Sequence, residues 1–306
     1  MEQRKSGFPW VFQLFKRKEN RSTSDGFASN TSSENEVNTT LVANKPGMDD
    51  FKIIRKIGKG GFGRVFLAEH SKENKLVALK VIVKKEIPET KADKEHVQAE
   101  HFVQTNMAHP FIAKLFCSFQ TRTKIFYASE FLQGGELFSW MEKFERFSEV
   151  NLFFGFDENQ LFKIIFFFFL QHWARFYLAE IFLAIEYLHE NNIVYRDIKP
   201  ENIMLDAKGH ARLIDFGLCK IGVSEDDRTH TRTHCGTNSY MAPEILNKGQ
   251  LYGPAVDWWS FGILAFDMMC GGPPWKGSDK HETFRYSITF LAICSMAFYR
   301  ETLSKS

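Results

Sequence analysis

The most informative run of this chain is "NNIVYRDIKPENIMLDAKGHARLIDFG", residues 191–217. It places Asp197, Lys199 and Asn202 on one short loop. Asp215 comes later in the run, directly before a Phe-Gly pair. Transfer of a phosphoryl group to a hydroxyl needs a carboxylate that orients the alcohol, a cation near the moving phosphate and hard oxygen ligands for Mg²⁺. Asp197 fits the first role, Lys199 the second, and Asn202 with Asp215 the third. Asp and Asn also favour turns for their own reasons, but together these residues predict a phosphoryl-transfer site.

Upstream, "FKIIRKIGKGGFGRVFLAEH", residues 51–70, predicts a strand, a glycine turn and a second strand. Gly58, Gly60 and Gly63 would let backbone amides approach a phosphate chain without obstruction by side chains. A dinucleotide-binding fold uses similar spacing, but there the loop leads into a helix. Here Val65 begins a β-rich segment, which argues against the dinucleotide-binding interpretation.

The next segment, "KLVALKVIV", residues 75–83, predicts a third strand that carries Lys80. A lysine inside an apolar strand costs several kcal/mol unless an anionic group meets its ammonium. Two candidates for that group are a nucleotide phosphate and Glu100, which lies on a predicted helical segment, residues 91–105. The alternative is a surface lysine on an edge strand.

Together these motifs resemble the signature set of eukaryotic protein kinases. The match runs from Phe51 to about Gly277 and also includes "APE" at 242–244 and "DWWSFG" at 257–262. Tyr195 before Arg-Asp is typical of the AGC group, and "GGELF", "DFGLCK" and "THCGT" look most like the ribosomal protein S6 kinases. The serum/glucocorticoid-regulated kinases and protein kinase C remain open as relatives.

The resemblance implies an α+β fold with two lobes. The N-lobe, residues 50–132, would be small, rich in β-strands and equipped with one helix. The C-lobe, residues 133–285, would be mainly helical and would lack the last helices of the family.

The resemblance also implies where ATP and Mg²⁺ bind. Residues 130–132 would form the hinge that hydrogen-bonds adenine, and Ala78, Val65 and Leu205 would enclose the ring. The implied nucleotide contacts are Ile57, Gly58, Lys59, Gly60, Gly61, Phe62, Gly63, Arg64, Val65, Ala78, Lys80, Glu100, Glu130, Leu132, Glu136 and Leu205.

Regulation and substrate choice follow from the same resemblance. Thr233 would be phosphorylated by an upstream kinase, and its phosphate would pair with Arg196. Thr237 would steady the carboxylate of Asp197 and favour Ser/Thr over Tyr as acceptor. Glu136 and Glu201 would contact arginines, so we expect protein substrates with basic residues N-terminal to the target Ser/Thr.

Two functional hypotheses therefore stand. One is a serine/threonine protein kinase that transfers the γ-phosphoryl group of ATP to protein hydroxyls. The other is a catalytically impaired nucleotide-binding scaffold or an incomplete gene product.

Two residues near the site depart from the family pattern. Ser129, before the hinge, is smaller than usual for the family, and Gln104 replaces an aliphatic residue one turn after Glu100. A buried unpaired amide would cost about 1–3 kcal/mol and loosen the active arrangement.

Composition indicates a soluble globular protein and gives no reason to expect a nucleic-acid partner. The 306 residues are 44% hydrophobic and 25% charged, as in soluble globular proteins. A net charge of +2 gives no reason to expect nucleic acid. The five cysteines have no metal-ligand spacing and suggest reduced thiols. We expect a monomer without a membrane span, located in the cytoplasm, with the nucleus open as a second location.

Three segments depart from the kinase pattern. Residues 1–49 predict a disordered tail and linker, because their Ser/Thr/Asn-rich part cannot bury enough apolar surface to fold.

Residues 150–171 form an insertion inside the 50–285 kinase domain, with four consecutive phenylalanines. They are too interrupted for a spanning helix, which needs about 20 apolar residues. Pyrimidine-rich Phe codons suggest an intron read as protein; a surface insertion and a membrane or partner contact are the alternatives. Residues 286–306 form a tail unlike the family, so Glu244 would lose its usual arginine partner.

Overall fold

The computed structural model describes residues 46–59, 63–143, 160–224, 230–233, 235–247, 249–275 and 281–289, with backbone alone for 160–171. All of them belong to one compact unit, Pro46–Ser306. Most of the expected disordered tail, the tip of the glycine loop, the first part of the insertion and most of the C-terminal tail lie outside the described residues.

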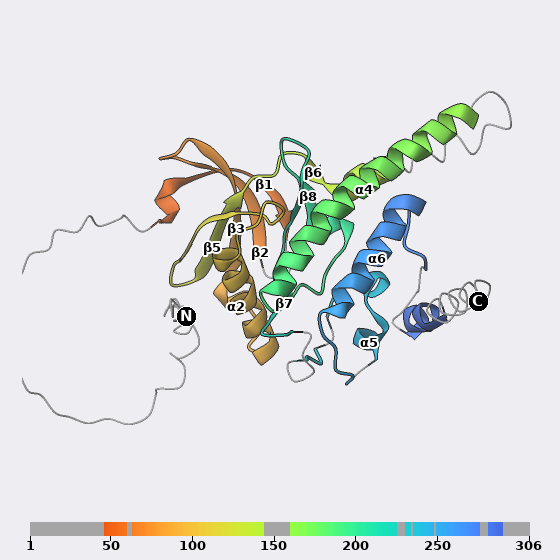
Figure 1. Ribbon diagram of the computed structural model, residues 1–306. Coiled ribbons are helices and arrows are strands. Elements are labelled where there is room, and N and C mark those ends of the chain that lie inside the picture. Colours follow the sequence, from red (N-terminus) through yellow and green to blue (C-terminus); the bar gives the residue numbers. More distant parts are fainter. Residues whose placement is uncertain are drawn as a thin grey trace, which may run out of the picture. The chain divides into compact units, whose positions relative to one another are not determined.

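The N-lobe is built on a five-stranded antiparallel sheet with the order β1-β2-β3-β5-β4 (Figure 1). The glycine loop joins β1 to β2, and Gly58 pairs with Val65 across these strands. The loop therefore runs from strand to strand, as predicted. The bounds are Phe51–Lys59 for β1, Gly63–His70 for β2, Lys75–Val83 for β3, Leu115–Gln120 for β4 and Lys124–Glu130 for β5, with 3-10 turns at Met48–Asp50 and Lys84–Glu86.

Alternation along the strands gives this sheet two different faces. On one face, the rings of Phe119 and Phe126 stack with centroids 4.7 Å apart, and Phe51 stacks on Phe119 at 5.5 Å. Leu79, fully buried, belongs to this apolar cluster. The opposite face carries Lys80, and its neighbours in the register are Val65 and Tyr127. A strand with period two thus directs a lysine away from the apolar cluster.

Helix α2, Lys91–Asn106, packs against the face that carries Lys80. Its N-cap is Thr90, whose hydroxyl accepts a hydrogen bond from the backbone N–H of Asp93 at 3.1 Å. Val103 of α2 is fully buried and belongs to the largest apolar cluster among the described residues, together with residues of the C-lobe. The helix therefore connects the sheet to the C-lobe core.

The C-lobe is built around two helices, α4 (Gln160–Glu190) and α6 (Ala255–Cys270), which lie side by side (Figure 1). Ile181, Ile185 and Leu188 of α4 are almost completely buried in the core. The expected two-lobed α+β fold is confirmed. The smaller elements are β6 (Gly135–Glu136), β7 (Ile193–Val194), η3 (Pro200–Asn202), β8 (Ile203–Leu205), β9 (Ala211–Leu213), β10 (Lys220–Ile221), η5 (Asn238–Tyr240) and α5 (Pro243–Leu246).

From Gln160 onward, the backbone of the predicted insertion is helical and continues without a break into the kinase-like sequence. Helix α4 begins at Gln160, so residues 160–171 form its first turns, and residues 150–159 lie outside the described part of the chain. Among the described side chains of α4, Ala174 is the first buried one, with 3% exposure. The sequence boundary at residue 171 is therefore no boundary of secondary structure.

Candidate active site

A lysine and two carboxylates meet where β3, α2 and the segment after β9 approach one another. The ammonium of Lys80 contacts the carboxylate of Glu100 directly. Its Nζ also lies 3.6 Å from Oδ1 of Asp215. Glu100 is 1% exposed, so the charge of Lys80 has an anionic partner inside the protein. The structure thus brings together three of the predicted residues from three separate elements.

Charge coupling shifts the pKa values of this pair. Burial alone would lower the pKa of Lys80, but Glu100 and Asp215 offset burial and leave it raised. Burial also raises the pKa of Glu100, although Lys80 opposes that shift. The lysine is therefore held as an ammonium, ready to face an anionic ligand.

A second cluster surrounds Asp197. Nζ of Lys199 lies 2.9 Å from Oδ2 of Asp197 and donates to the hydroxyl of Thr237 at 2.8 Å. The hydroxyl of Thr237 in turn donates to Oδ1 of Asp197 at 3.0 Å. The amide of Asn202 donates to Oδ2 of Asp197 at 2.7 Å. Three side chains hold this carboxylate in a fixed orientation. That is what a carboxylate needs in order to orient a substrate hydroxyl.

Asp257 of α6 holds the loop that carries this carboxylate by accepting hydrogen bonds from its backbone. Asp257 is completely buried, and its Oδ2 accepts from the backbone N–H of Tyr195 at 2.8 Å. Its Oδ1 accepts from the backbone N–H of Arg196 at 2.7 Å, and the ring of His189 lies 2.7 Å from Oδ2. No role was predicted for Asp257. The sequence did offer a signal for its role: Asp257 lies in the largely apolar run "DWWSFG", and a buried carboxylate needs hydrogen-bond partners.

Besides Asn192, two residues with a side chain in the segment 191–217 have left-handed backbone. Arg196 has φ +68° and Asp215 has φ +55°. Such conformations cost about 1–3 kcal/mol for residues with a side chain and cluster at functional sites. The bonds from Asp257 to the residues around Arg196, and the bond from the N–H of Gly217 to Oδ1 of Asp215 at 3.2 Å, hold the two turns.

Asn202 and Asp215 supply oxygens of the kind that Mg²⁺ binds. The NH₂ group of Asn202 makes two bonds to Asp197, one to the carbonyl at 2.8 Å and one to the carboxylate at 2.7 Å. Its amide oxygen is therefore turned away from Asp197. The carboxylate of Asp215 is 39% exposed, so it is accessible to a ligand. The donor set fits a magnesium ion shared with a phosphate. No cluster of three or more His, Cys, Asp or Glu side chains suited to a metal occurs in the described residues.

The residues expected around adenine lie on both lobes. Ala78 of β3 pairs with Leu67 on one side and with Ser129 on the other. Leu132 and Leu205 are each 5% exposed. In the segment between the lobes, the carboxylate of Glu130 accepts from the backbone N–H of Lys114 at 2.8 Å. Ile57, Gly58 and Lys59 lie on β1 and Gly63, Arg64 and Val65 on β2, whereas Gly60, Gly61 and Phe62 lie outside the described residues.

Arg196 and Thr233 are linked through the hydroxyl of Tyr252. Nη1 of Arg196 donates to this hydroxyl at 3.1 Å, and the hydroxyl donates to the backbone carbonyl of Thr233. Arg196 is 3% exposed and also donates to backbone carbonyls of Leu218 and Cys219. Burial raises the pKa of Tyr252 to about 12. The phenol is thus a neutral bridge, which sequence reasoning missed.

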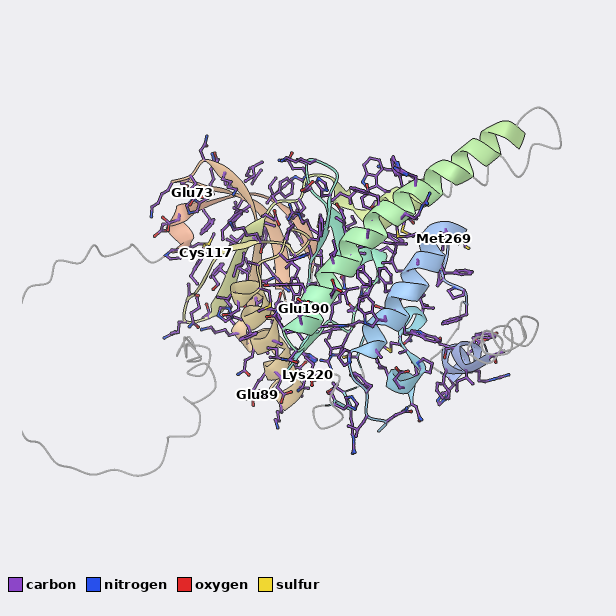
Figure 2. The ribbon with its side chains drawn as sticks, in the orientation of Figure 1. Glu73, Glu89, Cys117, Glu190, Lys220 and Met269 are labelled. Carbon is purple, nitrogen blue, oxygen red and sulfur yellow. The ribbon has the colours of Figure 1, made fainter. Side chains whose placement is uncertain are left out.

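Helix α2 is also tied to β10. Nζ of Lys220 donates to Oε2 of Glu95 at 2.9 Å, and Lys220 lies beside the N-terminal part of α2 (Figure 2). This hydrogen bond to Lys220 lowers the pKa of Glu95. The helix that carries Glu100 is thereby connected to the segment that follows Asp215.

The two carboxylates expected to contact substrate arginines are both exposed. Glu136 lies in β6, where it pairs with Met204 of β8, and Glu201 lies in η3. Within the described part of the chain, neither carboxylate makes a hydrogen bond or an ion pair. Their charges are therefore available to a basic partner.

Comparison with known proteins agrees with this geometry. The protein kinase domain family matches residues 51–304. The chain belongs to the protein kinase family. Protein kinase domains in general use ATP and Mg²⁺. The four described thiols, Cys117, Cys219, Cys235 and Cys270, are free.

Several AGC kinases are relatives at about the same distance. The chain is 42% identical over 240 residues to ribosomal protein S6 kinase beta of Caenorhabditis elegans, covering 78% of this chain and 39% of the relative. It is 41% identical over 236 residues to the human serine/threonine-protein kinase Sgk2, covering 77% and 57%. It is 40% identical over 239 residues to protein kinase C eta type of Mus musculus, covering 78% and 31%. The chain spans less than two thirds of each relative, and these identities do not single out the S6 kinases.

One further expectation concerned membranes. Within the part of the chain that the structure describes, no helix is long and apolar enough to cross a bilayer.

Proposed function

We propose that this protein is a serine/threonine protein kinase that transfers the γ-phosphoryl group of ATP to Ser/Thr hydroxyls of proteins, in the manner of the AGC group and, by its motifs, most like the S6 kinases. The contact of Lys80 with Glu100, with Asp215 beside it, carries the proposal. Lys80 would bind nucleotide phosphates, and Asn202 with Asp215 would hold Mg²⁺, which neutralises phosphate charge when bound.

Asp197 would receive the substrate hydroxyl, because its carboxylate is fixed by Lys199, Asn202 and Thr237. Lys199 would also offset negative charge on the moving phosphoryl group. A phosphate on the side chain of Thr233, added by an upstream kinase, would pair with Arg196, whose guanidinium already reaches the backbone carbonyl of Thr233 through the hydroxyl of Tyr252. Glu136 and Glu201 would favour basic residues before the target Ser/Thr.

A phosphotransfer assay tests the proposal. The wild-type chain should phosphorylate an arginine-rich Ser/Thr peptide with ATP and Mg²⁺. Asp215→Asn should lower incorporation on the order of a hundredfold or more, because one Mg²⁺ oxygen loses its charge. Asp49→Asn, at an exposed position before β1, is the matched control and should retain activity. Equal incorporation by the wild type and Asp215→Asn would refute the proposal.

The competing function is a nucleotide-binding scaffold. It is favoured by Gln104, whose buried Oε1 has no hydrogen-bond partner in the described structure and lies one turn from Glu100 on α2. A scaffold would show higher thermal stability with ATP and Mg²⁺ but no phosphate incorporation. Incorporation that depends on Asp215 would exclude it.

A further inference from the structure

Tyr252 holds the residues that precede and include Thr233 with three hydrogen bonds. The backbone N–H of Thr231 donates to the carbonyl of Tyr252, and the N–H of Tyr252 donates to the carbonyl of Thr231, both at 3.0 Å. The phenolic hydroxyl of Tyr252 donates to the backbone carbonyl of Thr233. Thr231 is buried as well. Residues 230–233, called here the Thr233 segment, are therefore fixed to Tyr252 by its backbone and by its side chain.

The same hydroxyl connects the Thr233 segment to Arg196, the residue next to Asp197. Nη1 of Arg196 donates to this hydroxyl at 3.1 Å. Nε of Arg196 donates to the carbonyl of Leu218 at 2.7 Å, and Nη2 donates to the carbonyl of Cys219 at 3.4 Å. Nη1 is thus the nitrogen of the guanidinium that is turned toward the Thr233 segment. A single oxygen joins that segment to the loop that carries the catalytic carboxylate.

The ring of Tyr252 is a fixed support for this bridge. It is buried in an apolar cluster that includes Val194, Ile245 of α5 and Val256 of α6. Burial raises the pKa of the phenol to about 12. The hydroxyl therefore keeps its proton, and it can donate to the Thr233 carbonyl while it accepts from Arg196. Removal of the oxygen alone leaves the apolar contacts of the ring in place.

We propose that Tyr252 is a positioning residue that holds the Thr233 segment against Arg196 before Thr233 is phosphorylated. A phosphate on Thr233 then pairs with Arg196 directly and makes the phenolic bridge dispensable. This inference rests on the proposed kinase function and deepens it, because it gives the unphosphorylated chain a basal activity that depends on one hydroxyl.

The first experiment needs no substitution. It compares hydrogen exchange of the Thr231 amide in the full chain with and without phosphothreonine at position 233, which is introduced during translation. Fragmentation in a mass spectrometer isolates this amide. The exchange rates of the two forms should agree within about threefold, because the acceptor of the Thr231 amide, the carbonyl of Tyr252, is already in place without the phosphate. Exchange that the phosphate slows by much more than about tenfold would overturn the inference, because the phosphate itself would then order the segment.

Tyr252→Phe removes the bridging oxygen. In the unphosphorylated chain, exchange of the Thr231 amide should become about tenfold faster, and kcat for an arginine-rich Ser/Thr peptide should fall about tenfold, the effect of losing one hydrogen bond to a charged group. KM for ATP should stay unchanged. In the phosphorylated chain, kcat should stay within about twofold of the wild type, because the phosphate pairs with Arg196 directly. A merely structural role would lower kcat equally in both forms, and that result would refute the positioning role.

Tyr187→Phe is the matched control. It also removes a phenolic oxygen of the C-lobe, at a half-buried position on α4. This oxygen accepts from the backbone N–H of Ala108 at 3.3 Å, so the Thr233 segment does not depend on it. Exchange of the Thr231 amide should be unchanged in Tyr187→Phe, and so should the ratio of kcat between the phosphorylated and unphosphorylated forms.

The exchange and transfer measurements also distinguish the two proposals. Peptide phosphorylation in which Tyr252→Phe leaves that ratio of kcat unchanged would refute the positioning role and support the kinase function. Faster exchange of the Thr231 amide in Tyr252→Phe, without peptide phosphorylation by either form of the wild type, would support the bridge and refute the kinase function.

Discussion

Gln104 is the residue whose environment contradicts its chemistry most clearly. It lies on the face of α2 that also carries Glu100, and its Oε1 is buried without a hydrogen-bond partner in the described structure. An unpaired buried acceptor costs about 1–3 kcal/mol, whereas an apolar side chain of similar size costs nothing of that kind. Gln104→Leu should therefore raise the free energy of unfolding by about 1–2 kcal/mol.

Urea denaturation of Gln104→Leu measures this directly. Gln98→Leu is the matched control, because it makes the same change on the same helix at a half-buried position. It should stay within about 0.5 kcal/mol of the wild type. A loss of stability in Gln104→Leu would mean that the amide has a favourable role in the fold.

Individual site residues were predictable where one residue type had to meet a specific need. Lys80 in an apolar strand needed an anionic partner, and the structure supplies Glu100. Asp257 and Tyr252 were not predicted, because their partners are backbone groups and an arginine that lie far away in sequence. Only the folded chain reveals such contacts.

At the scale of elements, the approach of the hinge segment to β8 depends on Gly134. A Cβ there would lie 2.6 Å from Cβ of Leu205 and 2.8 Å from its carbonyl oxygen, and the N–H of Gly134 donates to that carbonyl at 2.9 Å. Gly134→Ala should destabilise the fold by about 1–3 kcal/mol. It should also raise KM for ATP, because Leu205 is expected to line the adenine site.

Gly262 in α6 provides the opposite case. A Cβ at this position meets no atom within 4 Å, and the residue is helical. Gly262→Ala should stabilise the protein by about 0.5–1 kcal/mol, because alanine is the better helix former. Thermal unfolding of both variants gives the comparison. Similar changes in the two would show that the contact with Leu205 does not limit position 134.

Elements were predicted well where the sequence has a clear period and poorly where it is uniformly apolar. The alternation in residues 51–83 gave the first three strands and their order in the chain. The phenylalanine run offers no helical stripe, yet its backbone from Gln160 onward is helical. Helix formation needs only backbone hydrogen bonds and neighbours already in the helix. The adjoining segment up to Glu190 supplies them.

For the whole molecule, the two-lobed fold was predicted from the resemblance of its motifs to those of protein kinases. The relation between the lobes did not follow, because it rests on contacts such as the burial of Val103 of α2 in the C-lobe core. The described side chains of α4 that enter the core begin at Ala174, after the insertion ends at residue 171.

A protein that lacks residues 150–171 should therefore keep its fold and its activity. The deletion joins residue 149 to His172 and leaves every described buried side chain of α4 in place. We expect the free energy of unfolding to stay within about 1 kcal/mol of the wild type, because the deletion removes no side chain of the described core. Loss of a strongly apolar stretch should also reduce aggregation. Urea unfolding, light scattering and peptide phosphorylation of both chains test this. If the shortened chain unfolds cooperatively only at much lower urea, then the first turns of α4 contribute to the core, and the interpretation of this segment as foreign to the kinase fold is wrong.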